Sequence, residues 1–89
     1  MNFGFNYSLH FYEHAGRYQE TLSVPGSTLA DAIEVAEARH PGFKALLMEG
    51  GGTAVSTANG IFLKRSGKPT VPVADLKTPL ADGDALAFW

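Results

Sequence analysis

Hydrophobic and polar residues alternate near the start of the chain. From position 5 to position 12, one side of an extended chain carries the apolar residues Phe5, Tyr7, Leu9 and Phe11. A period of two predicts a half-buried strand over residues 5–12. The pattern breaks at 13–16, and the less regular run at 18–24 predicts a second strand. The two are close enough in sequence to form a β-hairpin.

A helical pattern follows the break at Pro25-Gly26. Apolar residues recur at spacings of three and four, at Leu29, Ala32, Ile33 and Ala36. This spacing predicts an amphipathic helix that ends at His40-Pro41. Thr28 is the predicted N-cap, and Asp31 stands where a capping box places its acidic residue. A further short helical turn is predicted over 43–48, with Phe43, Leu46 and Leu47 pointing inward.

The second half of the chain predicts short strands separated by turns. Gly50–Gly52 is expected to be a flexible loop, and 55–64 a strand interrupted by a tight turn at Asn59-Gly60. A turn at 66–69 leads to a short edge strand at 71–73, where prolines discourage further pairing. Leu76 and Leu80 are expected in the core, and a last strand runs from Ala85 with Leu86 and Phe88 as its apolar residues.

The resulting order of elements is β-β-α-β-(short β)-β. The first and last strands are the most apolar, so we expect them to pair in the middle of a sheet with the helix lying across it. The predicted fold class is α+β: a ubiquitin-like β-grasp with a mixed sheet of four to five strands and one main helix.

Composition sets limits on the function. Eighty-nine residues predict one domain spanning 1–89, and the 45% of hydrophobic residues suffice for a core. The net charge of −2 gives no general attraction to nucleic acid or anionic membrane, and neither is expected as a partner. The chain has no cysteine, and its N-terminus resembles neither a signal peptide nor a membrane span. We expect a cytoplasmic protein that is a monomer on its own.

Three motifs resemble those of a known family. They are Pro25-Gly26-Ser27-Thr28-Leu29 at the helix start, Ala58-Asn59-Gly60 in mid-chain, and Thr78-Pro79-Leu80-Ala81-Asp82-Gly83-Asp84 before the last strand. The last is the most specific. Together they resemble the MoaD/ThiS-like ubiquitin-fold sulfur carriers, namely the small subunit of molybdopterin synthase and the thiamine sulfur carrier. The resemblance covers nearly the whole chain, and residues 64–74 look like a lengthened excursion.

The resemblance implies a C-terminal tail. In that family the last strand leads into an extended segment ending in Gly-Gly, whose carboxylate a partner enzyme adenylates and converts to a thiocarboxylate. The present sequence ends at Trp89, near where such a tail would begin. Two interpretations stay open: a member that lacks the tail but keeps the docking surface, or a carrier whose tail is absent from this chain. As it stands, we expect this chain not to be adenylated or thiocarboxylated.

The favoured function is a non-catalytic, protein-binding module. It would dock onto a larger partner, an adenylating or cofactor-dependent enzyme, as a structural or regulatory subunit. The alternative is a sulfur carrier for molybdopterin or thiamine-type cofactor biosynthesis. The predicted contact surface is the exposed sheet face and the last strand, with Phe62, Leu86, Phe88 and Trp89 as contacts and Arg65 and Lys68 at the rim. Core packing is the competing interpretation, and it is stronger for Leu86 and Phe88 than for Trp89.

Other candidate sites have simpler explanations. His10 and His14 have a chelating spacing only on a helix, and the predicted strand would separate them. The glycine-rich segment 49–52 lacks the lysine and hydroxyl of a phosphate loop, and the basic segment 64–68 is expected to be a solvated loop. Asp82 and Asp84 are explained by a turn. We therefore expect no catalytic, metal or cofactor-binding residues, and no bound cofactor.

Overall fold

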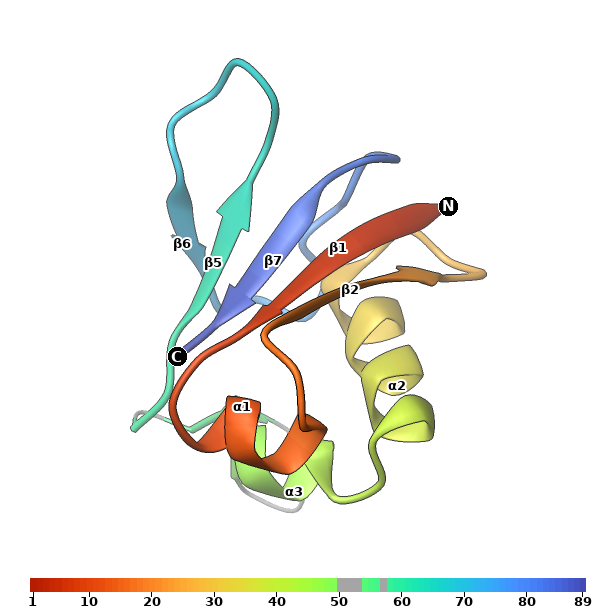
Figure 1. Ribbon diagram of the computed structural model, residues 1–89. Helices are drawn as coiled ribbons and strands as arrows, with labels where there is room; N and C mark the ends of the chain where they lie inside the picture. Colours follow the sequence, from red (N-terminus) through yellow and green to blue (C-terminus); the bar gives the residue numbers. More distant parts are fainter. Residues whose placement is uncertain (50–53, 57) are drawn as a thin grey trace.

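A five-stranded mixed sheet forms the body of the protein. The computed structural model describes residues 1–49, 54–56 and 58–89 (Figure 1). The strands of the sheet, in the order in which they lie side by side, are β2 (Gln19–Ser23), β1 (Asn2–Tyr7), β7 (Ala85–Phe88), β5 (Ile61–Lys64) and β6 (Val71–Val73). A separate two-stranded sheet pairs β3 (Met48–Glu49) with β4 (Ala54–Val55). The helices are α1 (His10–Ala15), α2 (Leu29–Arg39) and α3 (Phe43–Leu47).

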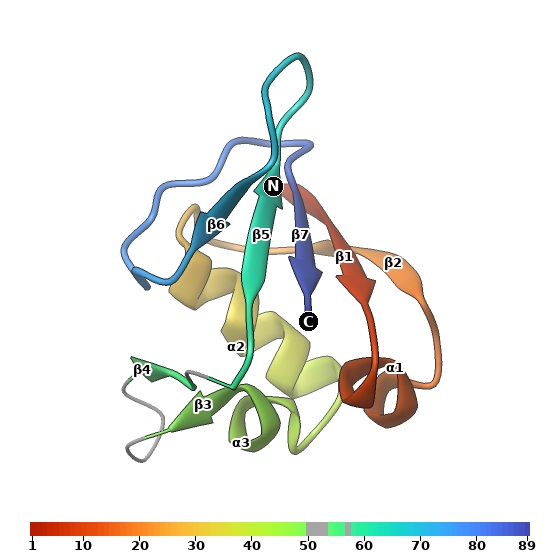
Figure 2. The same ribbon diagram turned by 90° about the vertical axis from the view of Figure 1, so that its left-hand side faces the viewer.

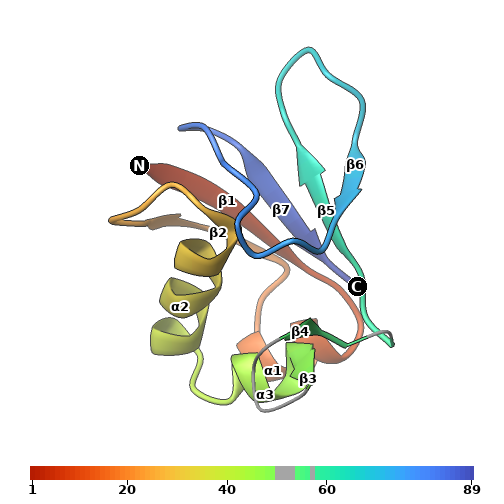
Figure 3. The same cartoon turned by 180° about the vertical axis from the view of Figure 1, so that it is seen from behind.

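The first and last strands lie in the centre of the main sheet. β1 pairs with β7 in parallel, and the other neighbouring strands of this sheet are antiparallel. α2 packs across one face of the sheet, while α1 and α3 close one end, as Figure 3 shows from behind. This arrangement confirms the predicted α+β, β-grasp fold with its mixed sheet and single main helix.

The start of α2 is determined by local sequence. The Thr28 hydroxyl accepts a hydrogen bond from the Asp31 amide, and the Asp31 carboxylate accepts one from the Thr28 amide. This reciprocal capping box is the predicted one, and it satisfies amides that a helix start would otherwise leave unpaired. The apolar face of the helix, including Ile33, is buried against the sheet.

The prediction of a strand over residues 5–12 was wrong beyond Tyr7. The chain turns at Leu9, which has a positive φ of 53°, and then forms α1. Phe11 lies on α1 and its side chain is buried in the core, whereas Leu9 is 65% exposed. Period-two alternation therefore placed Phe11 correctly in the core, but it could not show that a helix brings it there.

The region before β5 also differs from the prediction. Val55 pairs with Met48 in the small sheet, so residues 55–64 do not form one interrupted strand. The short helix α3 is confirmed, but its Leu46 is only partly buried while Phe43 and Leu47 are fully buried. Leu80 is buried as predicted, and Leu76 packs against the core from a partly buried position. The predicted loop at Gly50–Gly52 lies outside the described residues.

Candidate docking surface

One face of the main sheet is not covered by a helix. Figure 2 looks onto this face, with α2 behind the strands. The strand register places residues of neighbouring strands opposite one another on it: Gly4 opposite Ala85, Asn6 opposite Ala87, and Ala87 opposite Phe62. Because side chains alternate along a strand, their neighbours in sequence point toward α2 and are buried.

The side chains on this free face carry little charge. The outward positions of the five strands hold small, neutral or aromatic residues, and Lys64 is the one charged residue among them: Asn2, Gly4, Asn6, Gln19, Thr21, Ser23, Phe62, Lys64, Pro72, Ala85 and Ala87. No strand contributes a carboxylate to this face, although the chain as a whole has a net charge of −2. The strand side chains of this face are therefore neutral to slightly positive.

A shallow hollow of about 600 Å³ lies over β1, β7, β5 and the segment before β6. Its apolar part is formed by Phe62, Ala87 and Trp89, and its polar part by Asn6, Ser8, Lys64 and Thr70. Ala87, which lies opposite Phe62 in the strand register, is the smallest of these three side chains. An apolar floor with a few polar groups around it is typical of a binding site.

The backbone of Trp89 is fixed by hydrogen bonds, while its side chain is exposed to solvent. Its amide donates to the Gly60 carbonyl at 2.9 Å, and its carbonyl accepts from the Gly60 amide at 3.0 Å. The residue is nevertheless 52% exposed, the largest side chain among the exposed apolar residues of the described chain. A fixed main chain reduces the entropy that an aromatic side chain loses when it binds a partner.

Two of the predicted contact residues belong to the core instead. Leu86 and Phe88 are 0% exposed, and the Phe88 ring lies 5.1 Å from that of Phe43 and 6.1 Å from that of Phe5. Both side chains point toward α2 because they alternate with Ala87 and Trp89. They cannot reach a protein bound to the free face, so core packing was the correct interpretation for them.

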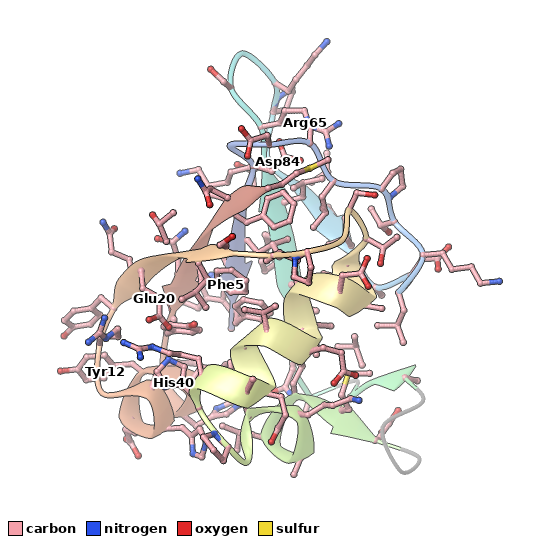
Figure 4. All side chains as sticks on the ribbon, turned by 90° about the vertical axis from the view of Figure 1, so that its right-hand side faces the viewer. Phe5, Tyr12, Glu20, His40, Arg65 and Asp84 are labelled. Carbon is pink, nitrogen blue, oxygen red and sulfur yellow. The ribbon has the colours of Figure 1, made fainter. Side chains whose placement is uncertain are left out.

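Arg65 is part of an internal ion pair. Its Nε and a terminal nitrogen donate to the carboxylate of Asp84, at distances from 2.7 to 3.2 Å. Asp84 is 2% exposed and also accepts from the Ala81 amide. The hydrogen bond from Arg65 holds the pKa of the Asp84 carboxyl below its usual value. The pair joins the end of β5 to the turn before β7 (Figure 4), which gives Arg65 a structural role besides its predicted place at the rim.

The Asp82-Gly83-Asp84 motif is a structural turn, as predicted. The Asp82 carboxylate accepts the Asn2 amide at 2.6 Å, and the Gly83 amide donates to the Asn2 carbonyl. Gly83 has a φ of +89°, a conformation that side chains other than glycine rarely adopt. The motif thus fastens the start of β1 to the start of β7. Lys68 lies exposed in the β5–β6 loop, and its predicted role at the rim stays a prediction.

The histidines lie differently from the prediction. His10 and His14 are both on α1, but their rings have separate partners: His10 contacts the Asn59 side chain, and His14 the Pro41 carbonyl. His40 contacts the Glu20 carboxylate, which also accepts the Tyr7 hydroxyl at 2.7 Å. Burial acts to raise the pKa of Glu20, but these hydrogen bonds outweigh it and leave the pKa lowered. Burial, followed by the bond to Glu20, raises the pKa of Tyr7.

Within the described ranges, no cluster of three or more histidine or acidic side chains is arranged to hold a metal ion. No helix of those ranges is both long enough and apolar enough to cross a membrane.

Sequence reasoning found two members of the hollow, Phe62 and Trp89, and missed the others. Ala87 had a visible signal, because it alternates with the buried Leu86 and Phe88. Asn6 and Ser8 alternate with the apolar residues of the strand predicted over 5–12, but nothing local placed them beside β7. Thr70 joins them only because the β5–β6 hairpin folds back, which depends on tertiary structure.

Comparison with known proteins supports the fold. No protein-family model matches the chain, and no curated protein matches it in sequence. Among solved structures it resembles SAMP1 from Haloferax volcanii, at 22% identity over 100% of this chain and 93% of that one, with a TM-score of 0.76. It also resembles a chain of the Amycolatopsis orientalis BexX/CysO complex, at 21% identity over 98% of this chain and 92% of that one, with a TM-score of 0.73.

A third similar structure is a putative molybdopterin converting factor, subunit 1, from Pyrococcus furiosus. It shares 22% identity over 99% of this chain and 94% of that one, with a TM-score of 0.71. At identities this low, the similarity establishes a shared fold. It confirms the β-grasp resemblance that the three sequence motifs predicted.

Proposed function

We propose that this protein is a non-catalytic β-grasp module that docks onto a larger protein through the free face of its sheet. The observation that supports this most strongly is the hollow formed by Phe62, Ala87 and Trp89. A soluble domain gains nothing for its own stability by exposing half of a tryptophan, whereas a partner pocket would bury it. Tryptophan is also among the residues that most often dominate binding energy.

The similar structures support a role in a complex. A chain of the same fold is part of the BexX/CysO complex of Amycolatopsis orientalis. By analogy, the partner of the present chain would be a larger enzyme, adenylating or cofactor-dependent, with this chain as its structural or regulatory subunit. The analogy rests on fold, so the partner must be identified by experiment.

The hollow restricts the chemistry of the partner. Its apolar floor suits an aliphatic or aromatic side chain, and Lys64 at its edge favours a neutral or acidic neighbour over a basic one. Nothing on the outward strand positions would repel a carboxylate. We therefore expect the partner to insert an apolar side chain into the hollow, with acidic or uncharged residues around that side chain.

The experiment has two stages. A photo-crosslinking amino acid is placed at Phe62 or, as a control, at Glu34, whose side chain is 60% exposed on α2. The proposal expects one protein of the source cells to be crosslinked from Phe62 and not from Glu34. Affinity for that purified protein is then measured for Trp89→Ala and Glu34→Ala by calorimetry.

Trp89→Ala is expected to weaken binding at least about tenfold, or 1.4 kcal/mol, with Glu34→Ala unchanged. Crosslinking from Glu34 alone, or an unchanged affinity of a folded Trp89→Ala variant, would place the interface elsewhere and reject the proposal.

The alternative function is a sulfur carrier in cofactor biosynthesis. It is favoured by the similarity to a putative molybdopterin converting factor subunit. A carrier needs a C-terminal glycine carboxylate, so the decisive measurement is the intact mass of the protein isolated from its own cells. A chain extending to Gly-Gly, with one oxygen exchanged for sulfur, would favour the carrier. A chain ending at Trp89 would favour the docking module.

A further inference from the structure

The two edges of the main sheet differ in their protection against pairing with other chains. β6 has three residues, contains Pro72, and follows Pro69. Short length and proline are devices that keep an edge strand from pairing further. β2 has five residues without proline or lysine, and its register with β1 is continuous, without a bulge. The edge formed by β2 therefore lacks proline, lysine and a bulge, and its one protective feature is the inward-pointing charge of Glu20.

The backbone of β2 presents an alternating set of groups at this edge. The Tyr18 carbonyl accepts the Tyr7 amide, and the Val24 amide donates to the Met1 carbonyl, both at 2.7 Å. Residues 18, 20, 22 and 24 thus face β1, and in an antiparallel ladder the residues between them face away. In the part of the chain that the structure describes, the outward backbone groups of Gln19, Thr21 and Ser23 have no hydrogen-bond partner elsewhere.

An aromatic pair lies at the start of this edge. The rings of Tyr12 and Tyr18 stack with their centroids 4.0 Å apart and an interplanar angle of 17°. Tyr18 is 69% exposed, so the stack fixes an aromatic surface that faces solvent. Figure 4 shows Tyr12 on α1 close to Glu20 of β2 and to His40 at the end of α2.

Two arginines give the same place a positive charge. Arg17 and Arg39 each approach one Glu20 carboxylate oxygen at 3.5 Å, and their side chains are 49% and 53% exposed. The Glu20 side chain is only 4% exposed, so its negative charge is directed inward. The charged groups exposed to solvent at this place are therefore the guanidinium groups of Arg17 and Arg39.

The acidic residues of α2 have their ion-pair and hydrogen-bond partners away from this edge. Glu34 pairs with Lys44, and Glu37 accepts the amides of Gly42 and Lys44. Asp31 belongs to the capping box at the opposite end of the helix. The two arginines outnumber Glu20, so a chain with a net charge of −2 carries a local positive surface beside the β2 edge.

We propose that β2 binds an extended acidic segment of a partner protein as an additional strand. The segment would exchange main-chain hydrogen bonds with Gln19, Thr21 and Ser23, as in other cases of strand addition. A carboxylate of the segment would reach Arg17 and Arg39, and a neighbouring apolar side chain would rest on Tyr18. This surface is separate from the hollow around Trp89, so the proposal goes beyond the docking function above.

A second copy of this chain is a poorer occupant. In a symmetric pair of β2 strands, the only acid that the second strand could offer is Glu20, which is buried and already paired. The two arginines would then gain no carboxylate from β2 of the second copy. The charge pattern therefore favours a different, acidic chain.

The test uses a blocked peptide in which valine and threonine alternate before a run of three glutamates, with a matched peptide ending in three glutamines. Hydrogen exchange of the ¹⁵N-labelled protein is followed by NMR with and without peptide. The proposal expects saturating glutamate peptide to slow amide exchange at least tenfold at Gln19, Thr21 and Ser23. The amides of Glu20 and Leu22, which already face β1, should change little.

Variants separate specific binding from general attraction. Arg17→Gln combined with Arg39→Gln should weaken peptide binding at least tenfold, as should replacing glutamate by glutamine in the peptide. Lys68→Gln, which removes an exposed cation from the β5–β6 loop, and Trp89→Ala should leave it unchanged.

Several outcomes would overturn the proposal. One is equal binding of the two peptides, and another is that exchange does not slow alternately at Gln19, Thr21 and Ser23. A third is slowing at Lys64 and Lys68 as large as that on β2. The last is slowed exchange of the β2 amides when the protein alone is concentrated. The last would indicate self-pairing.

Discussion

Phe88 and Trp89 are adjacent in sequence but face opposite sides of the sheet, and this difference can be measured as stability. Phe88 is 0% exposed, with its ring between 5.1 and 6.1 Å from those of Phe43, Tyr7, Phe11 and Phe5. Trp89 is 52% exposed and is held by a backbone pair with Gly60 that any side chain preserves. Truncation of the two residues should therefore have very different costs.

The magnitudes follow from burial. Phe88→Ala removes a fully buried ring and leaves a cavity, which costs about 3–5 kcal/mol. The loss of several aromatic contacts favours the upper part of that range, since such pairs contribute about 0.5–1.5 kcal/mol beyond their buried area. Trp89→Ala removes a side chain that is only half buried, and we expect it to cost about 1 kcal/mol.

Urea unfolding followed by circular dichroism is the suitable assay. Tryptophan fluorescence is not, because Trp89 is the only tryptophan of the chain. A domain of this size is stabilised by roughly 5–15 kcal/mol in total, so Phe88→Ala could lie near the limit of folding. Phe88→Leu keeps most of the apolar volume but loses the aromatic contacts, so it is expected to cost less than Phe88→Ala and provides a milder comparison.

The reasoning would be refuted if Trp89→Ala lowered the free energy of unfolding as much as Phe88→Ala. That result would mean that the indole covers the core rather than lining a surface hollow. It would also remove the main support for the docking function, because an exposed anchor would no longer exist.

Two further predictions concern the turn before β7 and the start of α2. The hydrogen bond from Arg65 lowers the folded-state pKa of Asp84, so its stabilising contribution is present at neutral pH and is lost as the pH falls through that lowered value. Asp84→Asn should therefore be less stable than the parent at neutral pH, and the difference between their urea midpoints should shrink in acid; a constant difference would argue against this origin. Thr28→Ala should lower the free energy of unfolding by about 0.5–2 kcal/mol through loss of the capping box, whereas Thr21→Ala, on the exposed face of β2, should change it by less than about 0.5 kcal/mol.

Features that depend on near neighbours were predictable from sequence. The capping box needs only Thr28 and Asp31, three residues apart, and the helix needs only its apolar spacing. The turn at Asp82-Gly83-Asp84 needs one glycine with positive φ. Alternation in the last strand places Leu86 and Phe88 on one side, but it does not show that this side faces the helix, and both were predicted as partner contacts although they are buried.

The error at residues 8–15 shows where local pattern fails. Phe11 occupies an inward position in both a period-two strand and a helix that begins at His10, so the spacing of apolar residues does not distinguish the two. The choice is made by tertiary contacts, because Phe11 packs against Phe43 of α3 with ring centroids 5.5 Å apart. That contact joins segments about thirty positions apart, and no local window contains both.

The sequence by itself determined which residues are apolar, where the main helix begins, and which side chains of the last strand point together. Only the tertiary structure decided what lies beside them. The hollow combines Asn6, Phe62 and Trp89 because β1, β5 and β7 become neighbours. The positive surface at β2 exists because Arg39 of α2 and Arg17 approach the same Glu20 carboxylate. The physical reason is that side-chain periodicity is set by the backbone of each strand or helix alone, whereas the pairing of strands depends on which distant surfaces bury the most apolar area together.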